Sequence, residues 1–405
     1  MTLVSNDLTN HLAEEQTILG IQLAFGATSR PVTDHRTRVR ALITDQVSPL
    51  VPAAEEERRF PREAVAALGA AGLFHERWSG GIHGDLGRAV VLAEEMGRAG
   101  LGGVGIGVGL HLEAATSLLR DFGTSAYAEA VLGLALAGES VCCVATSEQH
   151  VGSDLSAVET ELTREGTHWR VRGEKWFVSP GAAADFALVL CRGDRGPAIV
   201  IVPRTGLTPV KRWATTGMRS LETVRLRVDA RVADDAVLVR PGSGLAAVAQ
   251  GLMYERLALA AQILGALDLA SVLAITHLKR RRQFGSPLYR HQALRLRLAD
   301  LHSRILVARR GLYATVAEVS AGGPASLSDM AALKVTVARL GERVTSECAH
   351  IFGGRGYVED QNPMERLWRD LKVGRLGGGS DEMMWELVAA GFRPDHQLYD
   401  HWVAT

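Results

Sequence analysis

The sequence predicts an α+β protein of several domains, arranged in the order helical, β, helical. Apolar residues recur at helical spacing from Arg36 to about Glu139. Short runs that alternate apolar and polar residues follow from about Val141, and long helical segments return from Gly242. We therefore expect an N-terminal extension over residues 1–35, domains over 36–140, 141–241 and 242–391, and a tail over 392–405.

Composition excludes several classes of function. The 405 residues leave room for two or three domains, at roughly 100–200 residues each. Because 45 basic residues balance 45 acidic ones, nothing favours a nucleic-acid or membrane-surface partner. The four cysteines lack CxxC spacing, and Met1 to Gln16 lack the pattern of a signal peptide, so we expect a cytoplasmic protein. The sequence contains no HExxH, EF-hand or Walker A motif, so no metal site is predicted.

The first domain is predicted to be helical throughout. Val39 to Val47 carry apolar residues at helical spacing, Pro61 opens a second helix, and Ala89 to Met96 form a third. Pro31 is expected to mark a break between the N-terminal extension and this domain.

One glycine pattern in this domain resembles a nucleotide-binding motif. Gly100, Gly102 and Gly105 match G-x-G-x-x-G. That motif requires a preceding strand, whereas Val90 to Arg98 have a helical pattern. We therefore favour close packing of helices over a dinucleotide site.

The middle domain is predicted to be a compact β domain. Its strand-like runs, separated by glycine and proline, are Trp169–Arg172, Phe186–Leu190, Ala198–Val202 and Val224–Val228. The segment Thr146 to Asp154 joins it to the first domain and concentrates hydroxyls, a glycine and acids. Such a segment suits recognition of a phosphate or a ring by polar donors, and it is equally compatible with a capped turn.

The C-terminal domain is predicted to be a helical bundle, because long helices follow one another through short connections. The expected helices are Leu245–Arg281, Gln292–Ala321, Ser326–Phe352 and Asp381–Gly391. The most apolar stretch, Leu257 to Ile275, contains Gln262 and Asp268, which would be costly in lipid. We expect a buried bundle helix there and no membrane span.

The glycine run Gly377 to Gly379 is the first candidate for a functional segment. Three missing side chains let the backbone approach a ligand closely, and Ser380 or Asp381 can cap the helix that follows. The start of that helix could bind an anion. The same pattern is also typical of a flexible connection between helices.

Glu255 is the second candidate. It follows Leu252 by three residues and precedes Leu259 by four, so it lies on or beside an apolar helical stripe. Burial would raise the pKa of its carboxyl group towards the range of a general base. A salt bridge with Arg256, or an exposed position at the edge of the helix, is the alternative.

Six segments, in order and at family spacing, resemble motifs of the acyl-CoA dehydrogenase family, over about Arg36 to Gly391. They are Ser147–Asp154 (T-E-P-G-x-G-S-D), Lys175–Ser179 (K-x-W-I-T), Gly217–Ser220 (G-x-R-x-S), Arg281–Gly285 (R-x-x-F-G), Phe352–Tyr357 (F-G-G-x-G-Y) and Arg369–Asp370 ahead of the glycine run. The resemblance implies an N-terminal α-helical domain, a middle β-barrel and a C-terminal four-helix bundle. It also implies a homodimer or a dimer-based homotetramer, with FAD between barrel and bundle.

The resemblance assigns cofactor contacts residue by residue. FAD would contact Val144, Ala145, Thr146, Ser147, Ser153, Phe177, Val178, Ser179, Arg281, Phe284, Gln292, Gly353, Gly354, Ser380 and Glu382. Within this set, Arg281, Phe284 and Gln292 would hold the pyrophosphate and adenosine half across a subunit interface. Ser153, Arg256 and Gly378 would contact the substrate, an acyl thioester of coenzyme A or of a carrier protein. An electron-transfer flavoprotein is the implied type of electron acceptor.

The reaction that the resemblance implies is α,β-dehydrogenation. A carboxylate takes the α proton while the β hydrogen leaves as hydride to flavin N5. Many family members place that carboxylate in a Y-E-G-T segment, where this chain has Gly378. The long-chain and isovaleryl enzymes place it in an E-R-L segment of a bundle helix, which Glu255-Arg256-Leu257 resembles. Glu255 is therefore the predicted base, and the backbone N–H of Gly378 could polarise the thioester oxygen.

The sequence departs from the family pattern at several positions, namely Gln149-His150, Phe177-Val178-Ser179, His277 and His350. The altered loop at Gln149-His150 leaves open a flavin monooxygenase of the same fold, acting on an amine or a ring. A flavin-free binding paralogue is a further alternative, and the retention of nearly all flavin-contact positions argues against it.

Overall fold

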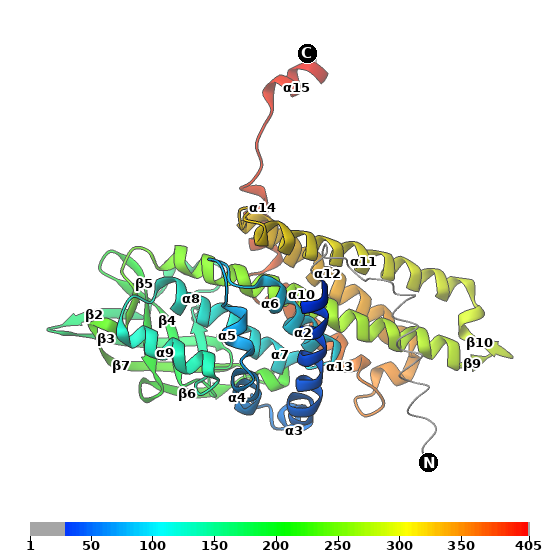
Figure 1. Cartoon of the computed structure of the whole chain (residues 1–405), viewed down its shortest axis with the longest axis horizontal. Helices are drawn as coiled ribbons and strands as arrows, with labels where there is room; N and C mark the ends of the chain where they lie inside the picture. Colours follow the sequence, from blue (N-terminus) through cyan, green and yellow to red (C-terminus); the bar gives the residue numbers. More distant parts are fainter. Residues whose placement is uncertain (1–28, 404–405) are drawn as a thin grey trace.

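A β-sheet lies at one end of the molecule and long helices extend to the other, with shorter N-terminal helices packed between them (Figure 1). The computed structural model describes residues 29–403. Within that range the order helical, β, helical follows the sequence prediction, and the arrangement is the predicted one of helical domain, β-barrel and helical bundle.

The N-terminal helices surround a core of aliphatic and aromatic side chains. They are α2 (Ser29–Leu42), α3 (Val51–Glu57), α4 (Arg62–Ala70), α5 (Leu73–Arg77), α6 (Leu86–Arg98), α7 (Gly102–Gly109), α8 (Thr116–Phe122) and α9 (Ala126–Ala137), with π-helical turns η1 (Ile43–Val47) and η3 (Leu110–Ala115). Val39, Ile43 and Val47 are all buried, as their spacing predicts.

The N-terminal boundary differs from the sequence prediction. Most of the predicted extension, residues 1–28, lies outside the described residues, but residues 29–35 already belong to α2. Pro31 lies in the first turn of this helix, where a proline is tolerated because its missing N–H has no partner there. It therefore does not break the helix.

The glycine pattern at residues 100–105 is a site of close helix packing, as expected. Gly102 opens α7 directly after α6, so no strand precedes it. A Cβ atom placed on Gly105 would lie 2.7 Å from the side-chain nitrogen of Gln262 on the central bundle helix. Glycine therefore lets these two helices approach each other.

The middle domain is one eight-stranded mixed sheet. Its strands are β1 (Cys142–Ala145), β2 (Glu161–Glu165), β3 (His168–Val178), β4 (Phe186–Gly193), β5 (Gly196–Pro203), β6 (Leu207–Arg212), β7 (Val224–Ala233) and β8 (Val237–Val239). The order is β6-β7-β3-β2-β4-β5-β8, and β1 pairs with β4 in parallel. All four predicted runs are strands, while β1, β2, β6 and β8 are additional.

The antiparallel register of β3 and β7 shifts between Lys175 and Val178, where Phe177 has a φ of +56°. Such an irregularity bends a strand and redirects its side chains. It occurs at the segment that was predicted to face the flavin ring.

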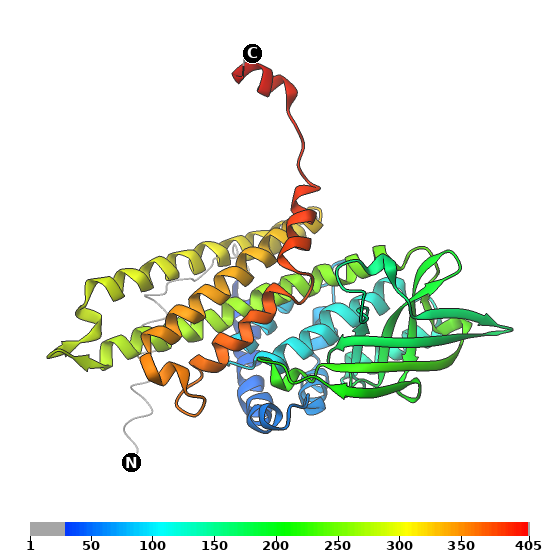
Figure 2. The same ribbon diagram turned by 180° about the vertical axis from the view of Figure 1, so that it is seen from behind.

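The C-terminal helices form the predicted bundle (Figure 2). They are α10 (Gly244–Arg280), α11 (Gln292–Ser320), α12 (Leu327–Ile351), α13 (Met364–Asp370) and α14 (Asp381–Ala389), and α15 (His396–Trp402) ends a projecting arm. Between α10 and α11 the chain forms a small hairpin of β9 (Arg282–Gln283) and β10 (Ser286–Pro287).

Helix α10 is the central element of the fold, because it packs against α6, α11 and α12. It is the one helix among the described residues that is long and apolar enough to cross a membrane. Most of its apolar window is buried inside the protein, which is typical of the core helix of a soluble fold.

Candidate active site

The carboxylate of Glu255 lies in the space that a side chain at Gly378 would occupy, although the two residues belong to different elements. Glu255 lies on α10 and is 5% exposed. A Cβ atom placed on Gly378 would lie 2.5 Å from Oε2 of Glu255, and Gly378 has a φ of +68°. Two features therefore favour glycine at position 378: the left-handed backbone, and the Glu255 carboxylate that fills the space of a side chain.

The surroundings of Glu255 suit a general base. Burial raises the pKa of its carboxyl group, while the charges of Arg256 and Lys334 act in the opposite direction. Its Oε2 atom is buried and accepts no hydrogen bond from the described residues. The predicted direction of the pKa shift is confirmed, and the carboxylate keeps a free oxygen for a proton.

The salt bridge between Glu255 and Arg256 that the sequence left open is replaced by a different contact. Nε of Arg256 donates a hydrogen bond of 2.9 Å to the carbonyl of Gly378. Its Nη1 atom is buried and makes no hydrogen bond within the described chain. One donor of this guanidinium group therefore remains available for another ligand.

The glycine run is held in place at several points. Nζ of Lys334 on α12 donates a hydrogen bond of 2.5 Å to the carbonyl of Gly379. The hydroxyl of Ser380 caps α14 by accepting a hydrogen bond from the backbone N–H of Met383 at 3.4 Å. The segment is therefore a turn with hydrogen bonds to α12 and α14. Glu382 is exposed beside this cap.

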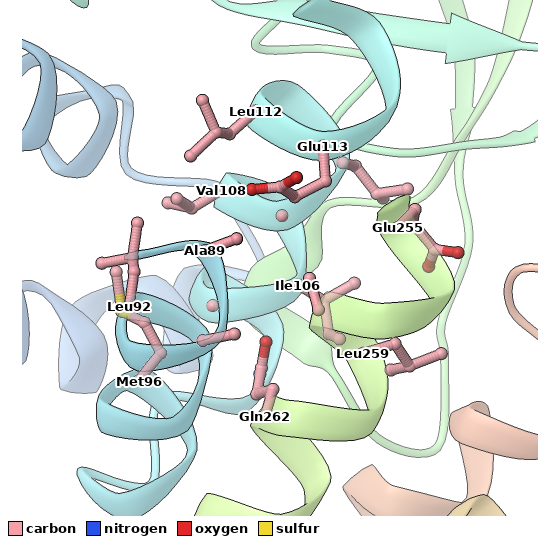
Figure 3. A pocket seen from close by; sticks show the side chains of 15 residues that line it. Ala89, Leu92, Met96, Ile106, Val108, Leu112, Glu113, Glu255, Leu259 and Gln262 are labelled. Atoms are coloured by element: carbon pink, nitrogen blue, oxygen red, sulfur yellow. The ribbon is translucent and has the colours of Figure 1, made fainter. Parts of the chain in front are cut away.

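A narrow apolar cavity lies between α6, α7 and α10 (Figure 3). Its internal volume is about 20 Å³, and its lining includes Ala89, Leu92, Met96, Ile106, Val108, Leu112, Glu113, Glu255, Leu259 and Gln262. In Figure 3 the carboxylate of Glu255 lies on the side of α10 away from Leu92 and Met96. The walls of this small cavity are mostly hydrocarbon, so they suit an apolar group.

The one other carboxylate in this lining is neutralised. Glu113 accepts hydrogen bonds from Nε of Arg77 at 2.9 Å and from Nη2 at 2.8 Å. Both side chains are almost fully buried. Because its oxygens are already paired, Glu113 is a less suitable base than Glu255.

The loop over residues 146–154 is fixed to β3 by a buried ion pair. Nζ of Lys175 donates to the carbonyl of Thr146 at 3.0 Å and to Oε1 of Glu148 at 2.7 Å. The backbone N–H of Trp176 donates to the carbonyl of Ser147 at 2.8 Å. Residues 144–147 and 175–179 therefore lie side by side. Both were predicted to face the flavin.

An exposed aromatic side chain stands beside this loop. Phe177 is 60% exposed, and its ring lies 5.4 Å from that of Trp213. The hydroxyl of Ser179 is within 2.8 Å of that of Thr223. Aromatic surface next to backbone polar groups suits a planar heterocycle, so the residues present fit a flavin.

The predicted contacts to the adenosine half lie elsewhere. Arg281 and Phe284 belong to the hairpin region, which lies at the opposite end of the molecule from the sheet (Figure 1). Gln292 opens α11 beside it. Gly353 and Gly354 leave open space where side chains would be, on the turn after α12. A single chain therefore does not bring these residues to the loop over 146–154.

The sequence pattern did not predict that two lysines of the site are buried. Lys334 is fully buried on α12, and Lys175 is fully buried on β3. A lysine within an apolar pattern is ordinarily assigned to the solvent edge, because its stem can extend to water. The signal that could have found Lys334 is its position between Ala331 and Val335, both of which are buried.

Comparison with known proteins gives one consistent family. The sequence matches the N-terminal domain of acyl-CoA dehydrogenase over residues 33–139, the middle domain over 143–230 and the C-terminal domain over 242–392. It is 42% identical over 375 residues to an acyl-[acyl-carrier-protein] dehydrogenase, MbtN, of Mycobacterium sp. (strain MCS), covering 91% of this chain and 95% of the relative. It is 29% identical over 367 residues to a short-chain specific acyl-CoA dehydrogenase of Clostridium acetobutylicum, covering 88% and 96%.

A solved structure agrees with this match. Butyryl-CoA dehydrogenase from Megasphaera elsdenii superposes with a TM-score of 0.84 at 26% identity, covering 90% of this chain and 98% of the other. The prolyl acyl carrier protein oxidase AnaB gives a TM-score of 0.82 at 22% identity, covering 90% and 100%, and so shares the fold.

Proposed function

This chain belongs to the acyl-CoA dehydrogenase family, and we propose that Glu255 is the base that removes the α proton of its substrate. Its reaction is the flavin-dependent dehydrogenation of an acyl thioester, with FAD as cofactor. FAD, when bound, accepts the β hydrogen as a hydride. The observation that supports Glu255 is its buried, unpartnered Oε2 in the space that a side chain at Gly378 would fill.

The other residues of the chain position the reacting groups. Thr146, Ser147 and Phe177 would hold the flavin ring, since Lys175 and Glu148 keep their loop in one conformation. The free Nη1 atom of Arg256 would bind a polar group of the substrate near the glycine run. The backbone N–H of Gly378 is the candidate donor to the thioester oxygen, where negative charge develops.

The substitution Glu255→Gln tests this assignment. We expect the rate of anaerobic flavin bleaching by an acyl thioester to fall by about 10²–10⁴-fold, the range of general-base catalysis. Glu386→Gln, at an exposed position on α14, is the matched control and should keep the rate. Full activity in Glu255→Gln, with flavin still bound, would show that another group takes the proton.

An exchange of positions sharpens the test. The double variant Glu255→Gly, Gly378→Glu moves the carboxylate from α10 to the glycine run, where other family members carry it. We expect the double variant to recover part of the rate lost in Glu255→Gly alone. Gly378→Glu alone should be strained, because its Cβ meets Oε2 of Glu255. No recovery in the double variant would contradict the shared position of the two side chains.

We propose an acyl-carrier-protein thioester as the substrate form and an apolar acyl chain as its acyl group. The support is the higher identity to relatives named as acyl-[acyl-carrier-protein] dehydrogenases than to the acyl-CoA enzyme, and the hydrocarbon lining of the cavity. Matched acyl groups on a carrier protein and on coenzyme A should differ at least about tenfold in kcat/KM, in favour of the carrier protein. Equal values would contradict this choice of carrier.

We also propose a homodimer or homotetramer, an electron-transfer flavoprotein as electron acceptor, and a cytoplasmic location. The separation of Arg281, Phe284 and Gln292 from the loop at 146–154 supports an oligomer, because a second chain could bring the two groups together. Cross-linking and sedimentation of the purified protein test it. The dehydrogenase relatives favour this reaction over a monooxygenase or a flavin-free paralogue.

A further inference from the structure

Lys334 is a fully buried cation whose role the reaction above leaves unexplained. Its side chain has no exposed surface, although it lies on α12 among buried apolar residues. Its ammonium group donates to the carbonyl of Gly379 at 2.5 Å. A buried charge is costly unless other charges or dipoles compensate it, so its surroundings must do so.

The charged groups that face Lys334 come from two elements. Glu255 and Arg256 lie on α10, and Asp381 opens α14. Oδ2 of Asp381 already accepts hydrogen bonds from Arg339 at 3.1 Å and Arg375 at 2.8 Å.

Glu255 has no comparable set of partners. Oε2 of Glu255 accepts no hydrogen bond from the described residues, and the Nε atom of the neighbouring Arg256 donates to Gly378. Lys334 binds the carbonyl of Gly379, and Gly378 before it abuts Oε2 of Glu255, so the ammonium group is a second positive charge near the proposed base.

We propose that Lys334 is a positioning residue for Glu255: bound to the carbonyl of Gly379, its ammonium group fixes the glycine run against the base and keeps the carboxylate ionised before substrate arrives. This inference rests on the proposed function of Glu255. Lys334 itself takes no proton from the substrate. It acts on the charge of Glu255 and on the backbone that Glu255 contacts.

The sign of the expected pH effect follows from the two pKa shifts. Burial raises the pKa of Glu255, and the charge of Lys334 opposes that rise. Removing the charge therefore leaves less ionised base at a given pH, and the acid limb of the rate profile moves to higher pH. Burial lowers the pKa of Lys334 to about 8, so its ammonium group is charged over the pH range of the acid limb.

The test compares Lys334→Met with wild type in the flavin-loaded protein. The rate of flavin reduction by one acyl thioester is measured anaerobically from about pH 5.5 to 9.5. We expect the midpoint of the acid limb to rise by about one pH unit. Lys372→Met is the matched control, because Lys372 is an exposed lysine paired with Glu342, and its profile should equal that of wild type.

Lys334→Gln separates charge from hydrogen bonding. Glutamine retains an N–H donor for the carbonyl of Gly379 but carries no charge. We expect the same shift of the acid limb as in Lys334→Met, with a smaller loss of thermal stability. A folded Lys334→Met or Lys334→Gln variant whose pH profile equals that of wild type would overturn the inference.

A readout without substrate covers the case in which Lys334→Met folds poorly. Thermal unfolding is measured for Glu255→Gln, Lys334→Met and the double variant. If the two charges are coupled, the double variant should lose less thermal stability than the two single variants lose together. If Lys334→Met does not fold, a folded double variant supports the coupling, and failure of both overturns it.

The two proposals fail in different ways. If Glu255→Gln reduces flavin at the wild-type rate, Glu255 is not the base. If Glu255→Gln is inactive but the pH profile of Lys334→Met equals that of wild type, only the proposed role of Lys334 is wrong.

Discussion

The two groups of residues assigned to FAD differ in how the chain supports them. The group beside the sheet includes Thr146 and Ser147, whose carbonyls accept hydrogen bonds from Lys175 and Trp176. The group at the hairpin includes Phe284, which is 93% exposed and has a φ of +50°. Buried contacts within the chain fix the backbone of the first group, whereas the hairpin of the second group presents Phe284 to the surroundings.

This difference shows where the site is complete and where it is not. Beside the sheet and at the glycine run, residues of the same chain make the hydrogen bonds that hold the candidate site in place. At the hairpin, the oligomer proposed above would cover the exposed phenylalanine of a recognised motif. The comparison predicts that changes in the first group act on the stability of one chain, and changes in the second act on its association.

The largest effect is expected for Lys175→Met. This change leaves Glu148 buried without its ammonium partner, although Glu148 still accepts hydrogen bonds from the backbone of Glu159 and Thr160. Breaking one partner of a buried pair costs about 3–5 kcal/mol, which denaturant unfolding would measure. The released loop should also bind flavin less tightly.

Lys211→Met is the control for this change. Lys211 is exposed on β6 and lies over the ring of Trp213 at 4.3 Å, a contact worth about 0.5–1 kcal/mol. Equal losses in the two variants would mean that the buried pair does not support the loop.

Much of the fold could be predicted from the sequence, because its long periodic segments allow only one assignment. The strands β3, β4, β5 and β7 contain the predicted runs, and α10 spans Gly244–Arg280 where Leu245–Arg281 was expected. Two of the strands that were missed, β2 and β6, are largely exposed and carry charged residues, whereas β1 and β8 are buried but only four and three residues long. A short polar run lacks the alternation that identifies a strand.

The site was predictable where two positions inform each other. A glycine at 378 and a glutamate at 255 each have ordinary explanations, but together they indicated one displaced carboxylate, and the structure places the two in contact. Lys334 and the Lys175–Glu148 pair were not predictable, because a buried lysine is defined by partners from distant segments. Such partners become visible only when the helices and strands are in place.

An intermediate effect is expected for Gly378→Ala. The left-handed backbone strains any side chain by about 1–2 kcal/mol, and the added Cβ must also displace Oε2 of Glu255. Gly72→Ala provides the matched control, since Gly72 has a φ of +78° and no atom within 4 Å of an added Cβ. In denaturant unfolding, Gly72→Ala should show the loss due to backbone strain alone, and Gly378→Ala should lose at least as much.

The two glycine variants should differ in activity. Only Gly378→Ala should slow flavin reduction, on the order of 10²-fold, because misplacing a reacting group by about 1 Å can cost that much. Equal rates in the two variants would show that the position of Glu255 does not depend on the missing side chain at 378.

The smallest effect on the stability of one chain is expected for Phe284→Ala. Because this side chain is 93% exposed, its removal should change the free energy of unfolding by no more than about 0.5 kcal/mol. In an oligomer that covers the hairpin, the same change should shift sedimentation towards smaller species and reduce the flavin retained after gel filtration. Ile82→Ala removes an apolar side chain that is 78% exposed on an N-terminal loop, and it should leave both measurements unchanged. If Phe284→Ala matches Ile82→Ala in assembly and in bound flavin, the hairpin is not an interface and the adenosine half must be held by residues of the same chain.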